Sequence, residues 1–94
     1  MSRIAKLFED RSRKRFIAYI CGMDPDLPTS IDICRALVED GTDLIEIGVP
    51  FSDPLADGKT NQLAAERALA NGAKVDQVFE MARALRVESQ VPLV

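Results

Sequence analysis

The spacing of apolar residues changes along the chain, and three stretches have the pattern of buried strands. Residues 16–21 (FIAYIC) form a continuous apolar run, as expected for a strand that is covered on both faces. A second run, 44–49, is rich in branched residues and is stopped by Pro50. A third run begins at 91–94 (VPLV) and has the pattern of the start of another strand.

Before and between these runs, apolar residues recur at helical spacing. The predicted helices lie over 2–12, from a cap at Thr29 or Ser30 to Gly41, over 61–70, and over about 75–87. Lys74 is a poor cap for the last helix, because Ser, Thr or Asp is preferred there. The inward faces of the second and fourth helices are expected to comprise Ile33, Cys34, Leu37 and Val38, and Val75, Val78, Phe79, Ala82 and Leu85.

The order of these elements predicts the fold class. Strand, helix and strand follow one another within about 30 residues, which is the pattern of a βαβ unit with a right-handed crossover. Further alternation of strand and helix indicates an α/β protein with a parallel sheet.

The second strand carries one charged residue, Glu46, in its middle. Side chains alternate along a strand, so Ile45 and Ile47 face one side of the sheet and Glu46 faces the other. Burying an unpaired carboxylate is costly, so its presence in a strand needs a reason. Two interpretations remain open from the pattern alone: a structural carboxylate that is hydrogen-bonded in the interior, or a functional acid.

Two more acids, Asp53 and Asp57, lie on the loop that follows this strand. The loop is rich in Pro, Asp and Gly and has few free torsions. A carboxylate near a strand end, followed by acids on a stiff loop, is typical of acid/base sites in strand–loop–helix enzymes. The alternative is a plain turn, since Ala-Asp-Gly is ordinary turn chemistry and Pro50 and Asp53 can serve only to stiffen the loop.

Composition narrows the class of protein. The 94 residues suffice for one small domain, and the 47% apolar content is typical of a globular chain. A net charge of −3 argues against nucleic acid or an anionic membrane as a partner. For the same reason, the basic cluster at 11–15 is interpreted as a solvated linker rather than a phosphate or nucleic-acid patch.

Histidine is absent, which excludes catalysis by a His base and metal binding by His, and no metal site is expected. Cys21 and Cys34 have neither zinc spacing nor a disulfide framework and fit a reducing cytosol, so a cytoplasmic protein is predicted. No apolar run is long enough to span a bilayer, and residues 1–16 lack the apolar core of a secretion signal.

The stretch 46–58, EIGVPFSDPLADG, resembles the signature of the tryptophan synthase alpha subunit family. The likeness is thirteen residues long and free of gaps, and it extends to the flanks FIAY at 16–19 and RALANG at 67–72. The resemblance implies a (β/α)8 barrel enzyme, a lyase that cleaves indole-3-glycerol phosphate to indole and glyceraldehyde 3-phosphate. It implies no cofactor for this subunit, because the beta subunit of that enzyme carries the pyridoxal phosphate.

The resemblance also implies roles for individual residues. Glu46 matches the general acid/base of the retro-aldol cleavage, and partial burial would raise its pKa towards neutrality. Asp57 matches the carboxylate that accepts the indole N–H. Tyr19 is expected to face the substrate's ring, although a core tyrosine is the alternative, and Thr60 matches the loop threonine that couples this loop to closure.

Pro50 and Asp53 are assigned to the interface with the beta subunit, again by resemblance. The sequence departs from the family pattern at three positions. Met23 stands where the family usually has Gly, Lys59 where it has Pro, and Asn61 where it has an apolar residue. If Lys59 met Asp57, the lysine's charge would lower the pKa of that acid.

A complete (β/α)8 barrel needs roughly 250 residues, so residues 1–94 are expected to form only its N-terminal part: a leading helix, the first βα units and the start of a third strand. We therefore expect a truncated domain that does not turn over the substrate alone. The rival interpretation is a non-catalytic barrel fragment that folds by self-association or by complementation with the missing part, because open strand edges invite pairing.

Overall fold

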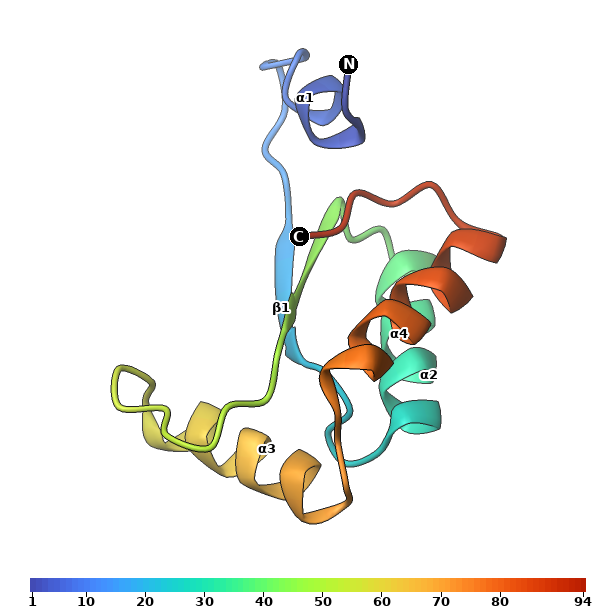
Figure 1. Cartoon of the computed structure of the whole chain (residues 1–94). Coiled ribbons are helices and arrows are strands. Elements are labelled where there is room, and N and C mark those ends of the chain that lie inside the picture. Colours follow the sequence, from blue (N-terminus) through green and yellow to red (C-terminus); the bar gives the residue numbers. More distant parts are fainter.

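A computed structural model describes all 94 residues and contains four helices around a small parallel sheet (Figure 1). The elements in chain order are α1 (Arg3–Leu7), β1 (Ile17–Cys21), α2 (Leu27–Glu39), β2 (Leu44–Gly48), α3 (Lys59–Ala70) and α4 (Val75–Glu88). The alternation of strands and helices confirms the predicted α/β class.

Strands β1 and β2 pair in parallel, with Ile17 opposite Leu44 and Tyr19 opposite Glu46. The segment 91–94 continues the sheet on the far side of β2. There the Ile45 N–H donates to the Pro92 carbonyl at 3.0 Å. The third strand-like run is therefore parallel to β2, as expected, although it forms only an isolated bridge.

The two faces of this sheet are covered unequally. Helices α2 and α4 pack together on one face, to the right of the strands in Figure 1. The main core lies between them and the sheet and comprises Met23, Cys34, Ile45, Ala68, Met81, Leu85 and Val91. Ile20 and Ile47 pack against that core, whereas Ile17, Tyr19 and Glu46 on the opposite face are exposed. The alternation predicted along the second strand is thus confirmed.

Helix α3 lies across the carboxyl end of the strands rather than on the covered face (Figure 1). Its buried residues are all alanines: Ala64 and Ala65 contact Cys21, and Ala68 reaches the main core. The larger Leu63 and Leu69 are exposed. Since a methyl group buries little apolar area, α3 gains less from packing than α2 or α4 does.

The ends of two helices differ from the sequence-based prediction. The first helix covers only Arg3–Leu7 instead of 2–12, and it buries no residue. Helix α2 begins earlier than expected, because Asp26 rather than Thr29 or Ser30 is its cap: the Asp26 carboxylate accepts from the Thr29 N–H at 2.9 Å.

The inward face predicted for the last helix is partly wrong. Val75 and Phe79 are each 59% exposed, and Met81 and Leu85 are the buried residues of α4. Ile33 of α2 is likewise exposed, while Cys34 is fully buried. Helical spacing identified the amphipathic pattern, but the choice between adjacent stripes depends on the packing partner.

A side chain within α4 compensates for the weak cap at Lys74. The Gln77 side chain accepts a hydrogen bond from the Lys74 backbone N–H at 2.8 Å. Gln77 therefore satisfies one free N–H at the start of α4, which is half of a capping box.

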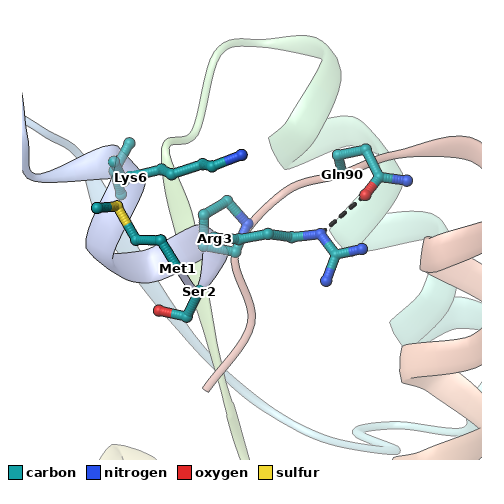
Figure 2. Close-up of a pocket in the computed structure, with 7 residues that line it drawn as sticks. Met1, Ser2, Arg3, Lys6 and Gln90 are labelled. Atoms are coloured by element: carbon teal, nitrogen blue, oxygen red, sulfur yellow. Dashed lines mark hydrogen bonds between the residues drawn. The ribbon is translucent and has the colours of Figure 1, made fainter.

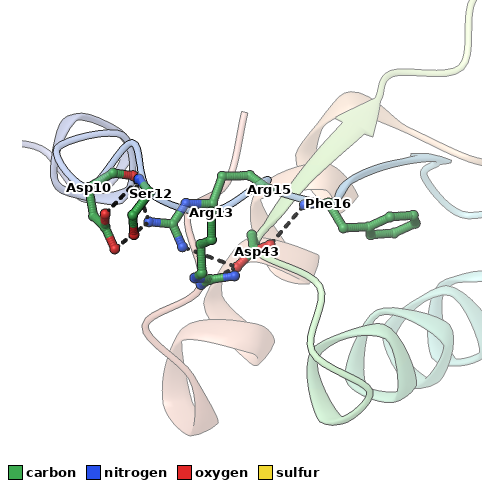
Figure 3. A network of polar contacts seen from close by, with 6 residues as sticks. All are labelled: Asp10, Ser12, Arg13, Arg15, Phe16 and Asp43. Atoms are coloured by element: carbon green, nitrogen blue, oxygen red, sulfur yellow. Dashed lines mark hydrogen bonds and ion pairs between the residues drawn. The ribbon is translucent and has the colours of Figure 1, made fainter.

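Asp43 fixes the amino-terminal end of the sheet (Figure 3). Its carboxylate accepts from the Phe16 N–H at 2.8 Å and from the Arg13 guanidinium at 2.9 Å, so it joins the residues just before β1 and β2. The Phe16 N–H and then Arg13 lower the pKa of Asp43. The Arg15 side chain lies alongside, 4.0 Å from the same carboxylate. Arg13 and Arg15 of the basic cluster are thus engaged within the chain.

Met23 has an uncommon backbone conformation for its residue type. Its φ is +62°, in the left-handed region, and its side chain is almost fully buried in the core. Glycine adopts this region without steric cost, which explains why the family resemblance leads one to expect Gly there. The structure keeps Met23 in this conformation and uses its side chain as core filling.

Candidate active site

The candidate site starts from two neighbouring side chains on the open face of the sheet. Tyr19 and Glu46 are register partners, so they project from the same face side by side. Tyr19 is 49% exposed, and Glu46 is also exposed. The expected partial burial of Glu46 is therefore wrong for this chain: α3 covers that face only at Cys21, and the middle of the face, with Tyr19 and Glu46, is exposed. The alternative of Tyr19 as a core residue is also wrong.

Gly48 gives the Tyr19 ring its place. A Cβ built on Gly48 would collide with the Tyr19 hydroxyl and ring, so any other residue here would require the ring to move. Partial burial raises the pKa of Tyr19, and the charges of Cys21, Asp57 and Glu46 raise it further.

Asp57 reaches this region from the loop between β2 and α3. Its backbone N–H donates to the Pro54 carbonyl at 3.2 Å, which closes a tight turn. The Gln62 side chain donates to the carbonyls of Asp57 and Pro54, at 2.8 and 3.2 Å. Sequence reasoning missed Gln62, although an amide one turn into a helix after a Pro- and Gly-rich loop is a usable signal. The turn interpretation and the functional interpretation of Asp57 are therefore compatible.

The remaining candidates lie along the same loop and the start of α3. Pro50 is half-buried at the strand end, and Asp53 is exposed. Thr60 was expected on the loop, but it is the second residue of α3, which begins at Lys59 rather than at residue 61. Lys59 forms no ion pair with Asp57. Asp57 and Asp53 line a shallow pocket of about 360 Å³ together with Phe51, Pro54, Leu55 and Ala56.

The largest cavities lie elsewhere and lack suitable chemistry. One of about 730 Å³ is formed by α1 and the segment 90–92, where the Arg3 Nε donates to the Gln90 side chain at 2.8 Å (Figure 2). A second of about 700 Å³ lies beside the basic cluster. Neither is lined by Tyr19, Glu46 or Asp57, so the candidate residues lie outside both large cavities.

Two further findings concern other kinds of site. None of the helices has the length and apolar character needed to cross a membrane. The structure brings together no group of three or more Cys, Asp or Glu side chains that could hold a metal ion.

Fold and site together define the opening section of a (β/α)8 barrel with one acid in the middle of its second strand and another on the loop that follows. The tryptophan synthase alpha chain family matches residues 5–94, and the chain belongs to this family. The resemblance in the stretch 46–58 is thereby confirmed for the chain as a whole.

Several relatives of this chain are tryptophan synthase alpha chains from different organisms. The tryptophan synthase alpha chain of Opitutus terrae is 54% identical over the whole chain, and that of Methanoregula boonei is 47% identical. In both comparisons the chain covers 36% of the relative. The chain thus spans about a third of the length of the curated relatives that it matches.

Solved structures confirm the fold. Tryptophan synthase subunit alpha from Legionella pneumophila superposes on 99% of the chain with a TM-score of 0.93 and 36% identity, and 37% of that subunit is covered. The tryptophan synthase α2β2 complex from Pyrococcus furiosus gives a TM-score of 0.80 at 39% identity, over 84% of this chain and 33% of that one. The fold is that of the N-terminal part of the barrel, as predicted.

Proposed function

We propose that this chain supplies the acid/base residues of a tryptophan synthase alpha-type lyase, which cleaves indole-3-glycerol phosphate to indole and glyceraldehyde 3-phosphate. The observation that carries the proposal is that Tyr19 and Glu46 stand side by side on the open face of β1 and β2, with the loop that carries Asp57 directly after β2. These are the positions at which the family signature places an aromatic and two acids.

The chemistry assigns different tasks to the two acids. Breaking the bond between the indole ring and the glycerol chain requires a proton at the ring carbon and loss of a proton from the glycerol hydroxyl. Glu46, on a rigid strand, is the general acid/base for these transfers. Asp57 accepts the indole N–H and stabilises the positive charge that develops on the ring. Tyr19 contacts the ring, and Thr60 helps to hold the loop closed.

The partner of this activity is a tryptophan synthase beta subunit. The Pyrococcus furiosus relative is described as an α2β2 complex, a heterotetramer. Pro50 and Asp53 lie on the loop next to the candidate site, so contact there would connect partner binding with the position of Asp57. The cytoplasm is the proposed compartment, because Cys21 and Cys34 are both free and buried, as suits a reducing environment.

A chimera tests the catalytic assignment. The chain is joined to the remaining barrel of the Opitutus terrae relative, and the release of indole from indole-3-glycerol phosphate is measured. Glu46→Gln should reduce turnover by about 10²–10⁴-fold, because a positioned general acid/base is lost. Asp57→Asn should also reduce it severely, since the amide lacks the negative charge. Glu66→Gln, at an exposed acid of α3, is the matched control.

Near-normal turnover of the Glu46→Gln chimera would refute the assignment. The 94-residue chain by itself should release no indole above the buffer rate. Its open face admits water, and water weakens the electrostatic effect of both acids.

A second function is supported by a separate observation. Large apolar residues are exposed in and just before β1, namely Phe16, Ile17 and Tyr19, and after β2, namely Val49, Phe51 and Leu55. Such a surface suits a non-catalytic chain that associates with itself or with a complementary barrel segment. Light scattering after size exclusion distinguishes the two: a sharp monomer with cooperative unfolding would count against this second function.

A further inference from the structure

Helix α3 carries the Asp57 loop but has little apolar packing of its own. The loop runs directly into α3, and Gln62 of α3 binds the backbone carbonyls of Pro54 and Asp57. Only alanine side chains of α3 are buried, as described above. The position of Asp57 therefore depends on what holds α3 against the rest of the molecule.

Two polar side chains of α3 and its C-cap provide that attachment. The Arg67 guanidinium makes a bidentate ion pair with Asp24, with both N–O distances at 2.9 Å. The Asn71 amide donates to the Pro25 carbonyl at 2.6 Å. Both partners belong to the turn between β1 and α2, beside which α3 lies in Figure 1. Bidentate guanidinium–carboxylate pairs fix orientation as well as distance.

The turn that receives these contacts is itself anchored in the core. Met23 is buried next to Asp24, and the fully buried Ser30 hydroxyl donates to the Asp24 carbonyl at 3.1 Å. The Asp24 side chain is only 17% exposed. Asp24 thus offers Arg67 a fixed partner, unlike a carboxylate on a mobile surface side chain, which must be immobilised at an entropic cost.

We propose that Arg67 and Asn71 are positioning residues, which hold α3 on the Asp24–Pro25 turn and thereby fix the Asp57 loop beside Tyr19 and Glu46. The importance of that placement for catalysis rests on the proposed function. The attachment itself does not, because it can be observed in the 94-residue chain without substrate.

Tyr19 provides a direct readout of the loop. It is the only tyrosine, and the chain has no tryptophan, so absorbance of the ionised phenol during an alkaline titration reports Tyr19 alone. Partial burial is the main cause that raises the pKa of Tyr19, and the charges of Cys21, Asp57 and Glu46 add to it. Hydrogen exchange of the Asp57 and Gln62 amides, which donate to the carbonyls of Pro54 and Gly58, is the second readout.

The double variant Arg67→Ala/Asn71→Ala should release α3 and the loop. Exchange at the Asp57 and Gln62 amides should accelerate about tenfold, while exchange in β1 and β2 stays unchanged, because the opening is local. The titration midpoint of Tyr19 should fall towards its ordinary value as Asp57 moves away. Arg35→Ala is the matched control, since Arg35 pairs with Asp32 and Glu88 on the far side of the molecule.

Conservative and compensating variants cover the case in which the double variant fails to fold. Arg67→Lys keeps the charge but loses the bidentate geometry, so it should show the same changes at smaller size. The exchange of charges in Asp24→Arg/Arg67→Asp should restore slow exchange relative to Asp24→Arg alone.

Two results would overturn the proposal. One is an unchanged Tyr19 midpoint and unchanged loop exchange in both the double variant and Arg67→Lys. The other is an equal acceleration of exchange in the loop and in the strands, which would give Arg67 a stabilising role only. A failure of the proposed function is seen separately, as normal indole release from the Glu46→Gln chimera.

Discussion

The two faces of the sheet formed by β1 and β2 differ in burial and in the kind of residue they carry. On the covered face, Ile45 and its neighbours pack against α2 and α4, and the contacts are apolar and close. On the open face, Ile17, Tyr19 and Glu46 stand exposed in the same strands, one residue out of phase. Alternate side chains of the same strands thus either pack in the core or stand exposed as candidate site residues.

The largest contrast should appear when matched isoleucines are truncated. Ile45→Ala on the covered face should lower the free energy of unfolding by about 2–5 kcal/mol, because a buried side chain leaves a cavity. Ile17→Ala, at a residue that is 45% exposed, should cost less than about 1 kcal/mol. Urea denaturation of both variants measures the difference. Equal losses would mean that the open face is covered in solution, for example by a second copy of the chain.

Met23, in the core on the covered face, combines a buried side chain with an unfavourable positive φ. Met23→Ala should lower the free energy of unfolding by about 2–5 kcal/mol. Met23→Gly should be less damaging by about 1 kcal/mol, since glycine has no Cβ to strain at positive φ. Thermal or urea unfolding of the pair measures the difference. An alanine variant as stable as the glycine variant would argue against strain at this position.

Low pH should destabilise the amino-terminal end of the sheet, which Asp43 holds together. Hydrogen bonding to the Phe16 N–H and to Arg13 lowers the pKa of Asp43 below its ordinary 3.8. The stability from this group is therefore complete above that value and is lost at lower pH, as the pH falls through the lowered pKa. Asp43→Asn should make unfolding less dependent on pH in that window. Denaturation followed by circular dichroism tests this, and an unchanged dependence would contradict it.

The smallest expected effect belongs to the open face. Glu46→Gln should lower the Tyr19 titration midpoint slightly, because the weakest of the charges that raise its pKa is removed. Stability should hardly change, since Glu46 contributes no buried contact. Glu66→Gln is the control. If Glu46→Gln lowered the free energy of unfolding instead, Glu46 would have a structural role.

The sequence was sufficient for features that depend on short spacing. Alternation along the second strand correctly separated Ile45 from Glu46, and the spacing of strand and helix predicted the parallel sheet. The signature at 46–58 identified the family. The assignments of Glu46 and Asp57 to catalysis and of Tyr19 to substrate binding stay predictions.

Other features depend on contacts between distant segments, which local patterns do not encode. Phe79 has the right spacing for an inward face, yet the packing of α4 on α2 buries Met81 instead. Glu46 is exposed, because the burial of a barrel's inner face depends on strands outside these residues. The contact of Arg67 with Asp24 joins residues that are 43 positions apart, and no motif predicts it.

The link that Asp43 makes to the Phe16 N–H also protects against mispairing of the strands. If β2 slid by one residue along β1, every side chain would change face: Glu46 would enter the apolar core and Ile45 would face water. The Asp43 carboxylate adds to the cost of such a slip at the end of the ladder, because it accepts from the Phe16 N–H in the native alignment. This hydrogen bond, which lies outside both strands, thus helps to keep Ile45 in the core and Glu46 on the open face.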